Sequence, residues 1–288
     1  MELIQLRQLV VIAEKKVLSH AAEKLNISQP ALTRSIQRLE DELGLLLFDR
    51  TKNSMTLNKN GELVVEQAKK VLSEVEFLMQ KVESLKSDFP VIAIATCAPA
   101  PQWKLSAELS EKFPKLKITS TMPDEDDIVS LLLSEKVTLA IVRKKIDSES
   151  IETIPFMDEQ LFMQIPLSDP LAKKKKIRFA DLAGKEIREY INTGFWHKVH
   201  REQIPDAHYI EYDDLMVYTN VIKSQNPLTF VTELGNTLRV KQEACVTLPI
   251  IDDEATAHYR LAYLKKNKNS LHEIISWAVK VDKDSPLE

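Results

Sequence analysis

Glycine is scarce in this chain of 288 residues: it has five, where average usage of roughly 7% would give about 20. No two of them are close enough for G-x-G-x-x-G or G-x-x-x-x-G-K-S/T, the loops whose backbone N–H groups approach a phosphate. The dinucleotide fingerprint and the P-loop are therefore absent, and a kinase or an ATPase has no support. The five glycines are Gly44, Gly61, Gly184, Gly194 and Gly235.

Long apolar runs and cysteines are also lacking. No run of about 18 apolar residues could form a transmembrane helix, and the start, which contains Glu2, has no basic region before an apolar core, so we expect no secretory signal. Cys97 and Cys245 alone cannot build a disulfide framework or a four-ligand zinc site. We therefore expect a cytoplasmic protein with reduced thiols, no membrane partner, no cofactor and no metal.

Proline is nearly absent from the first part of the chain. Only Pro30 precedes residue 90, and the other twelve prolines lie from Pro90 onward. The first 89 residues are therefore predicted to be helical, and the rest to alternate short elements with turns. The net charge of −4 argues against a general nucleic-acid coat. Residues 1–60 nevertheless carry nine Lys or Arg against seven Asp or Glu, which leaves room for a local basic face.

Three helices are predicted within the first 44 residues. Ser19 is expected to cap the second and Ser28 the third, with Pro30 in the first turn of the third helix and Gly44 just after its end. The first helix has apolar residues at helical spacing, namely Leu3, Leu6, Leu9, Val10 and Ala13. The third has a core face of Leu32, Ile36, Leu39 and Leu43.

The opposite face of the third helix is polar and basic, with Gln29, Thr33, Arg34, Gln37 and Arg38. Arg can pair bidentately with guanine and Gln with adenine, and Thr can contact the thymine methyl or a phosphate. Helix, tight turn and helix with such a face is typical of helix-turn-helix DNA binding. An amphipathic helix with a merely solvated outer face is the alternative.

Two β-prone segments, residues 47–51 and 55–57, predict a wing-like hairpin that places Arg50 and Lys52 near phosphates. Here the sequence resembles the LysR-type transcriptional regulators, over the run AAEKLNISQPALTRSIQRLEDELGLLLFDRTKNSMTLNKNGE. The resemblance implies DNA-contacting positions at Gln29, Pro30, Thr33, Arg34, Arg38, Arg50 and Thr51. We expect bases to be contacted by Gln29, Thr33 and Arg34, and phosphates by Arg38, Arg50, Thr51 and Lys52.

A long helix is predicted from its cap Asn58 to about Leu85. A heptad seam runs along it through Val64, Ala68, Val71, Val75, Leu78, Val82 and Leu85. The seam predicts a homodimer whose rod would hold two recognition helices on a two-fold related double-stranded DNA site. A helix packed on its own domain is the alternative. In the resembling family the equivalent helix is the dimer linker, and full-length proteins are commonly tetramers.

The remaining two thirds alternate strand-like and helix-like segments, a pattern typical of a parallel sheet. FPKLKITST and LLLSEKVTLAIV resemble the family's first effector subdomain, and DEQLFMQIPLSDPLAKKKKIRFADLAGKEI resembles the entry to the second. The resemblance implies two α/β lobes like those of periplasmic solute-binding proteins, with a ligand between them. The expected fold is α/β with an all-α N-terminal part: a winged helix-turn-helix domain over 1–58, a coiled-coil dimerisation helix over 59–89, and an effector-binding domain over 90–288. Lobe one is expected over about 90–158 and 259–288, and lobe two over about 159–258.

Ligands of open α/β sheets bind beyond the carboxyl ends of strands. Two such loops, residues 96–102 and 192–196, each precede a predicted helix whose N-terminal N–H groups suit a carboxylate. The expected effector is anionic with an apolar or aromatic part, with Thr96 and Thr193 donating hydrogen bonds. Ordinary loops with packed aromatics are the alternative. The expected effector contacts are Thr96, Cys97, Gln102, Thr193, Gly194, Phe195 and Trp196.

Three clusters have competing interpretations. His197 and His200, with His208 beyond, could bind a metal, but they have no clear carboxylate partner in the sequence and are interpreted as surface histidines. The acidic run 124–127 fits the positive end of the next helix better than a cation site. Cys97 could be redox-active near a helix N-terminus, although a buried inert thiol is favoured.

The sequence thus predicts a non-enzymatic, sequence-specific transcriptional regulator in which effector binding between the lobes changes the spacing of the DNA-binding heads. Two other classes stay open: a redox-responsive regulator using Cys97, and a solute-binding or enzymatic module with a secondary DNA domain. No nucleophile–base or metal spacing supports an enzyme.

Overall fold

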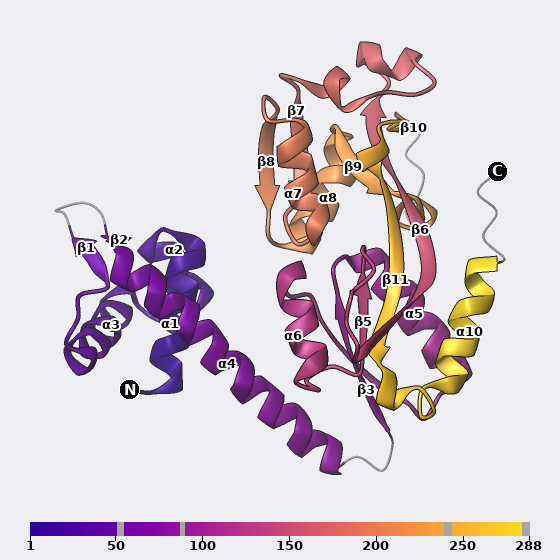
Figure 1. Cartoon of the computed structure of the whole chain (residues 1–288). Coiled ribbons are helices and arrows are strands. Elements are labelled where there is room, and N and C mark those ends of the chain that lie inside the picture. The colour runs from indigo at the N-terminus through magenta and orange to yellow at the C-terminus, as the bar shows by residue number, and fades with distance from the viewer. Residues whose placement is uncertain (51–54, 87–89, 239–243, 284–288) are drawn as a thin grey trace. The chain divides into compact units, whose positions relative to one another are not determined.

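A computed structural model of the chain describes residues 1–50, 55–86, 90–238 and 244–283. The chain divides into two compact units, Met1–Asp88 and Phe89–Glu288, which are described separately (Figure 1). Nowhere in the described ranges is a helix both long enough and apolar enough to cross a membrane.

The first unit packs three short helices against the beginning of a long one. These helices are α1 (Leu3–Lys15), α2 (Leu18–Lys24), α3 (Gln29–Leu43) and α4 (Lys59–Lys86). The buried residues repeat at helical spacing and meet in one core, made of Leu6, Leu9, Ile12, Ala21, Ala22, Leu32, Ile36, Leu39, Leu47, Phe48, Val65 and Ala68. Two expectations were wrong at the edges of this core. Leu3 is exposed, and Ser19 lies inside α2, whose cap position is held by Val17 without a side-chain bond.

The ends of α3 follow their local sequence. Ser28 Oγ accepts a hydrogen bond from the backbone N–H of Ala31 at 3.4 Å, and Gly44 ends the helix in the left-handed conformation with φ +66°. The buried carboxylate of Glu40 then accepts the backbone N–H groups of Leu47 at 2.7 Å and Phe48 at 3.3 Å. Glu40 therefore fixes the chain that leads from α3 into the hairpin.

The hairpin pairs β1 (Phe48–Arg50) antiparallel with β2 (Met55–Leu57). Asn58 follows it and caps α4, because its Oδ1 accepts from the N–H of Gly61 at 2.9 Å. A Cβ on Gly61 would lie 2.2 Å from the carbonyl oxygen of Leu47. The lack of a side chain at Gly61 thus lets the first turn of α4 touch the hairpin.

In the second unit, seven described strands form one sheet in the order β10-β6-β11-β5-β3-β4, with β9 paired to β6. β3 is parallel to β4 and β5, as expected, but β11, β10 and β9 run antiparallel to their neighbours. The expectation of a parallel sheet was therefore right for one part only. The strands are β3 (Val91–Thr96), β4 (Lys117–Thr121), β5 (Leu139–Val142), β6 (Ile151–Pro166), β9 (Thr229–Thr232), β10 (Cys245–Pro249) and β11 (Thr256–Leu264).

Strand β6 belongs to two lobes. Its first part pairs with β11, and its second part pairs with β9 and β10, so this one strand runs through the whole unit (Figure 1). One lobe contains β3, β4 and β5 with α5 (Pro99–Lys112), α6 (Ile128–Leu133) and α10 (His272–Lys283). The other contains the parallel pair β7 (Glu186–Tyr190) and β8 (His208–Tyr212) with α7 (Phe195–Gln203), α8 (Leu215–Gln225) and α9 (Glu233–Leu238). The sheet-and-helix lobes confirm the predicted fold class.

Both predicted effector loops are shorter than expected. Helix α5 begins at Pro99, three residues before the end predicted for the first loop, and α7 begins at Phe195. Two prolines fit the first turn of α5 because N–H groups there have no partner within the helix. The loops that remain are therefore residues 97–98 and 191–194.

Candidate functional site

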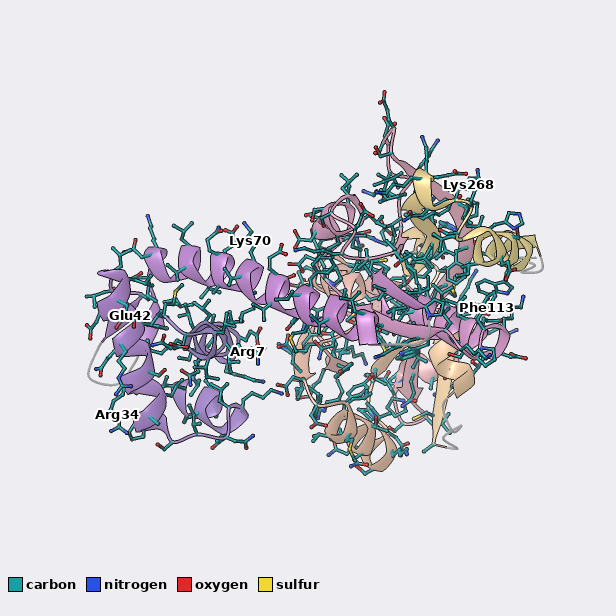
Figure 2. The ribbon with its side chains drawn as sticks, turned by 90° about the horizontal axis from the view of Figure 1, so that it is seen from below. Arg7, Arg34, Glu42, Lys70, Phe113 and Lys268 are labelled. Carbon is teal, nitrogen blue, oxygen red and sulfur yellow. The ribbon has the colours of Figure 1, made fainter. Side chains whose placement is uncertain are left out.

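The outer face of α3 is exposed as predicted. Gln29, Pro30, Arg34, Gln37 and Arg38 are all exposed. On the opposite face Leu32, Ile36 and Leu39 are fully buried and Leu43 is half-buried. Arg34, labelled in Figure 2, and Arg38 form no ion pair with any described residue, so both guanidinium groups remain available to a ligand.

Thr33 is only half-buried, and its hydroxyl donates to the carbonyl of Gln29 at 3.0 Å. The hydroxyl hydrogen of Thr33 is therefore already used within α3. Among the predicted phosphate contacts, Arg50 ends β1. Thr51 and Lys52 lie outside the described residues.

The predicted seam of α4 divides into two parts. Ala68 is buried and Val64 is half-buried against the core of the first unit. Further along, Val71, Leu78 and Leu85 are exposed, and Val75 and Val82 are half-buried. The first part therefore packs on its own unit, and the second presents an apolar stripe to solvent.

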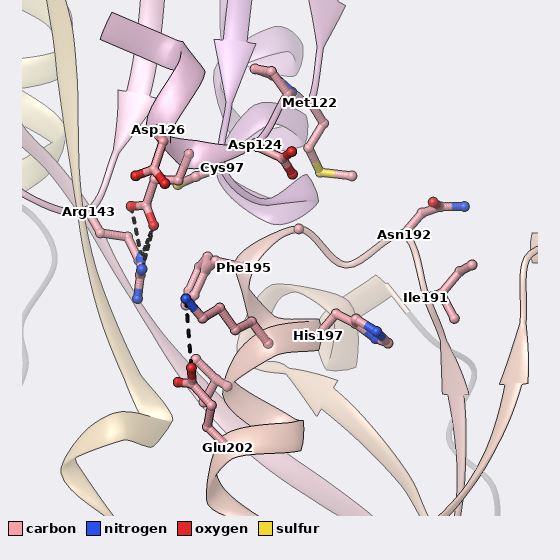
Figure 3. A pocket seen from close by; sticks show the side chains of 15 residues that line it. Cys97, Met122, Asp124, Asp126, Arg143, Ile191, Asn192, Phe195, His197 and Glu202 are labelled. Carbon is pink, nitrogen blue, oxygen red and sulfur yellow. Dashed lines mark hydrogen bonds and ion pairs between the residues drawn. The ribbon is translucent and has the colours of Figure 1, made fainter. Parts of the chain in front are cut away.

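A cavity of about 620 Å³ lies between the lobes of the second unit (Figure 3). One wall follows the carboxyl ends of β3, β4 and β5, and the other is made by the end of β7 and by α7. This is the position that open α/β sheets use for ligands. The lining residues are Cys97, Met122, Pro123, Asp124, Glu125, Asp126, Arg143, Ile191, Asn192, Gly194, Phe195, His197, Lys198, Val199 and Glu202.

The two predicted loops touch each other at the cavity. The backbone N–H of Phe195 donates to the carbonyl of Cys97 at 3.0 Å. Gly194 has φ +66° and ψ −138°, and a Cβ there would lie 2.1 Å from the same carbonyl oxygen. One of the N–H groups at the start of α7 is thus already used by the opposite lobe.

Arg143 is the central charge of the cavity. Its Nε lies 3.0 Å from Glu125 Oε1, a second guanidinium nitrogen contacts Oε2, and the guanidinium carbon lies 4.0 Å from the centre of the Phe195 ring (Figure 3). Burial opposes the charged form, but the bonds to Glu125 outweigh it and raise the pKa of Arg143. Among the described lining residues, Lys198 is the one lysine or arginine besides Arg143. Its Nζ lies 3.7 Å from Glu202 Oε1.

The lining also contains four carboxylates, from Asp124, Glu125, Asp126 and Glu202. With Glu125 on Arg143 and Glu202 near Lys198, the two aspartates are not balanced by a lysine or arginine of the lining. The sequence did not single out Arg143, Met122, Lys198 or Glu202. Residues just after the ends of parallel strands, as Met122 and Arg143 are, could have been identified from the strand pattern.

Of the predicted effector contacts, Cys97, Gly194 and Phe195 line the cavity, whereas four others do not. Thr96 is fully buried, and its hydroxyl donates to the carbonyl of Ala98 at 2.6 Å, so the expected bond to an effector is replaced by a local turn. Gln102 donates to Ser120 Oγ at 2.7 Å. Thr193 Oγ1 is buried without a hydrogen-bond partner among the described residues, but the residue is not part of the lining.

Trp196 belongs to the core instead of the cavity. Its indole N–H donates to Glu159 Oε2 at 3.2 Å, and Tyr259 Oη donates to the same oxygen at 2.7 Å. Burial raises the pKa of the Glu159 carboxyl. Because Glu159 lies on β6, this network attaches α7 to the strand that both lobes share.

The thiol of Cys97 is buried. Burial and the nearby charge of Glu125 raise its pKa to about 12, so the thiol is protonated at neutral pH. Cys97 and Cys245 are not joined by a disulfide.

Comparison with family models gives two matches. Residues 3–62 match a bacterial regulatory helix-turn-helix protein of the lysR family, and residues 91–273 match a LysR substrate binding domain. The DNA-binding transcriptional dual regulator OxyR of Escherichia coli K12 is 27% identical over 275 residues, which are 91% of this chain and 89% of that protein. A hydrogen peroxide-inducible genes activator of Pectobacterium carotovorum is 31% identical over 191 residues, and this match spans 65% of the chain and 63% of that relative.

Solved structures share the fold. A full-length OxyR variant from Pseudomonas aeruginosa superposes with a TM-score of 0.55 at 20% identity, covering 100% of this chain and 98% of that chain. Full-length CbnR complexed with its target DNA superposes with a TM-score of 0.51 at 19% identity, covering 98% and 100% of the two chains. At these identities the likeness concerns the fold alone.

Proposed function

Since the chain belongs to the LysR family of DNA-binding transcription regulators with an effector-binding domain, we propose that the outer face of α3 contacts the bases of a two-fold related operator and that a small effector binds between the lobes. The family is non-enzymatic. The observation that carries the proposal is the exposed polar face of α3, whose two arginines have no ion-pair partner among the described residues.

The DNA contacts divide by chemistry. Gln29 and Arg34 are exposed near the start of α3 and can form bidentate bonds to base edges in the major groove, with the methyl of Thr33 beside them. Gln37 and Arg38 lie one turn further along. Arg38, Arg50, Thr51 and Lys52 remain the proposed phosphate contacts, which fix the position of the helix on the duplex.

A second copy of the chain is proposed to cover the exposed stripe of α4. The stripe continues the heptad spacing beyond the part that packs on the first unit, and an apolar seam of this kind is stable when a partner helix buries it. Two copies would place two recognition helices on a two-fold related operator. A tetramer would be a pair of such dimers.

The proposed effector is an anion with an aromatic or apolar part. Arg143 supplies the positive charge and Phe195 the aromatic surface, and they lie in contact. Glu125 already occupies Nε and one Nη of Arg143, and the anionic group of the proposed effector would replace the Glu125 carboxylate at these two nitrogens. This exchange would alter the arrangement of the lobes and thereby couple the cavity to DNA binding.

A redox function for Cys97 has less support. The names of the similar proteins include hydrogen peroxide-inducible activators, but reaction with an oxidant requires a thiolate that the oxidant can reach. Cys97 is buried and has a raised pKa. We therefore propose that DNA binding is controlled by effector binding in the cavity and not by oxidation of Cys97.

Replacement of Arg34 tests the DNA interface. Target fragments would be selected from random-sequence DNA with the full chain, and binding would be measured by fluorescence anisotropy over a range of salt concentrations. The variant Arg34→Ala should lose about tenfold or more in affinity for the target, because one bidentate base contact is worth about 1–3 kcal/mol. Its affinity for scrambled DNA should change much less.

Lys70→Ala is the matched control, since Lys70 is an exposed cation of α4 that is paired with Glu66. It should leave both affinities unchanged. An equal loss of target and scrambled binding in Arg34→Ala would place Arg34 on a phosphate and contradict its proposed contact with a base.

A further inference from the structure

A buried charged cluster lies in the lobe that contains β7 and β8, and the proposed function does not use it. Glu189 of β7 and Glu211 of β8 are direct partners in the parallel ladder. Paired residues of neighbouring strands point to the same face of a sheet, so the two carboxylates lie side by side. Glu189 is 2% exposed. The Glu211 side chain is half-exposed, so the buried Glu189 carboxylate is the one that most needs a positively charged partner.

Helix α7 covers these carboxylates with three basic side chains. Arg201 Nη2 lies 2.7 Å from Glu189 Oε2 and 2.5 Å from Glu211 Oε1, while its guanidinium carbon lies 3.3 Å from the centre of the Tyr209 ring. His200 Nδ1 is hydrogen-bonded to Glu189 Oε1 at 2.6 Å. The interpretation of His200 as a surface histidine was therefore wrong, because the carboxylate partner comes from a strand that the sequence spacing does not reveal.

His200 sits deep in the lobe. It is 1% exposed, and its ring stacks on Phe230 with 3.6 Å between the ring centres. Burial lowers the pKa of His200, which favours the neutral ring. The bond to Oε1 holds the Glu189 carboxylate in one orientation and leaves Oε2 directed at the remaining groups.

His197 Nδ1 is buried, forms no hydrogen bond with any described residue, and lies 3.5 Å from Glu189 Oε2. The same Glu189 oxygen lies 2.7 Å from Arg201 Nη2. Ligand bonds of about 2.0–2.2 Å to one tetrahedral ion hold neighbouring ligand atoms about 3.3–3.6 Å apart. The Glu211 carboxylate completes the set, since one ligand atom from each of the three residues lies within 4.8 Å of the others.

The charges of the cluster favour a further cation. Two carboxylates, those of the buried Glu189 and the half-exposed Glu211, face the single guanidinium of Arg201. Arg201 reaches Glu189 through Nη2 alone, and its Nη1 is buried without a hydrogen-bond partner among the described residues. Glu211 is half-exposed, so an ion could enter from that side.

We propose that Glu189, His197 and Glu211 form a binding site for a divalent transition-metal cation of the Zn²⁺ type. One imidazole nitrogen and two carboxylate oxygens are donors that suit such ions, and water would complete the coordination. His200 positions Glu189 through its other oxygen, as the outer groups of metal sites commonly do. Arg201 is the competing cation. The site borders the cavity between the lobes, because His197 also lines that cavity.

Zinc titration of the metal-stripped full chain tests the site. By isothermal titration calorimetry the unaltered chain should bind one Zn²⁺, and the variants His197→Ala and Glu211→Gln should each lose about tenfold or more in affinity. Both side chains are partly exposed, so the variants should fold, which circular dichroism would check. His208→Ala removes an exposed histidine of the same strand β8 outside the cluster and should bind like the unaltered chain.

The variant Arg201→Gln separates a metal site from a purely structural ion-pair network. With the competing guanidinium removed, Zn²⁺ should bind more tightly, and it should restore the thermal stability that the substitution costs. If the cluster is a purely structural ion-pair network, Arg201→Gln should lower the Tm and Zn²⁺ should not raise it again. The proposal is overturned by that result, by the absence of binding to the unaltered chain, or by affinities in His197→Ala and Glu211→Gln equal to that of the unaltered chain.

Discussion

Single residues decide how the two lobes touch. Gly194 combines φ +66° and ψ −138° with a close approach to the carbonyl of Cys97, which lies almost a hundred residues earlier in the chain. Any side chain at this position would meet that carbonyl, and the N–H of Phe195 could no longer reach it. Gly194, one of only five glycines in the chain, therefore lies where the two predicted loops are in contact.

The variant Gly194→Ala should therefore destabilise the second unit more than Gly184→Ala. Both glycines have φ between +66° and +69°, but a Cβ at Gly184 would meet nothing within 4 Å. Gly184→Ala should cost about 1–2 kcal/mol for the left-handed conformation alone. Gly194→Ala should cost at least about 2 kcal/mol more, because the clash forces the backbone to shift.

Urea unfolding followed by circular dichroism would give the two free energies of unfolding. Equal values for Gly194→Ala and Gly184→Ala would mean that the contact between Gly194 and Cys97 does not limit the packing of the lobes.

At the scale of elements, α4 changes its partners along its length. Its first turns are part of the core of the first unit through Val65 and Ala68, and its later turns leave Leu78 and Leu85 exposed. A heptad pattern by itself indicates an apolar stripe and not what covers it. The contacts of α4 with its own unit account for the beginning of the stripe and leave the remainder exposed, which is where we propose that a second copy packs.

The variant Leu78→Glu should dissociate the proposed dimer. Leu78 lies on the stripe and is 60% exposed, whereas its neighbour Met79 is 62% exposed and lies off it. Loss of one buried leucine from each copy, together with burial of a charge, should raise the dimer Kd by about a hundredfold or more.

Sedimentation velocity at micromolar concentration would measure this change, with Met79→Glu as the control that stays dimeric. If both variants keep the sedimentation coefficient of the unaltered chain, the stripe of α4 is not the dimer interface.

At the scale of the whole molecule, the cavity proposed for the effector is lined by elements that are far apart in sequence. Arg143 follows β5 in one lobe, and Phe195 begins α7 in the other. The guanidinium of Arg143 lies over the Phe195 ring and is also hydrogen-bonded to Glu125. The site therefore contains an internal carboxylate in the position that an anionic effector would take. Removal of this competitor offers a direct test of the proposed effector chemistry.

Benzoate can serve as the probe, since it combines one carboxylate with one ring. The variant Glu125→Gln should bind benzoate about tenfold or more tightly than the unaltered chain, because charge-assisted bonds to Arg143 are worth about 1.5–3 kcal/mol. Asp126→Asn removes an equal charge from the same cavity without freeing Arg143, and should improve binding much less. Calorimetry that finds the same gain in both variants, or no benzoate binding in any of the three proteins, would contradict the proposed role of Arg143.

Local patterns in the sequence determined much of this protein. The helix-turn-helix, the caps at Ser28 and Asn58, the hairpin and the strands of the first lobe follow from residues that are neighbours along the chain. The family match confirms the regulator that these patterns predict. Periodicity and capping chemistry act over a few residues, so the sequence suffices for them.

Only the tertiary structure decided which side chains face the cavity and which face the core. Adjacent aromatics gave no sign that Phe195 would meet Arg143 while Trp196 would donate to Glu159. The spacing of His197 and His200 likewise did not reveal Glu189, which comes from a strand beside α7. Burial and charge pairing depend on contacts between distant segments, and such contacts exist only once the chain has folded.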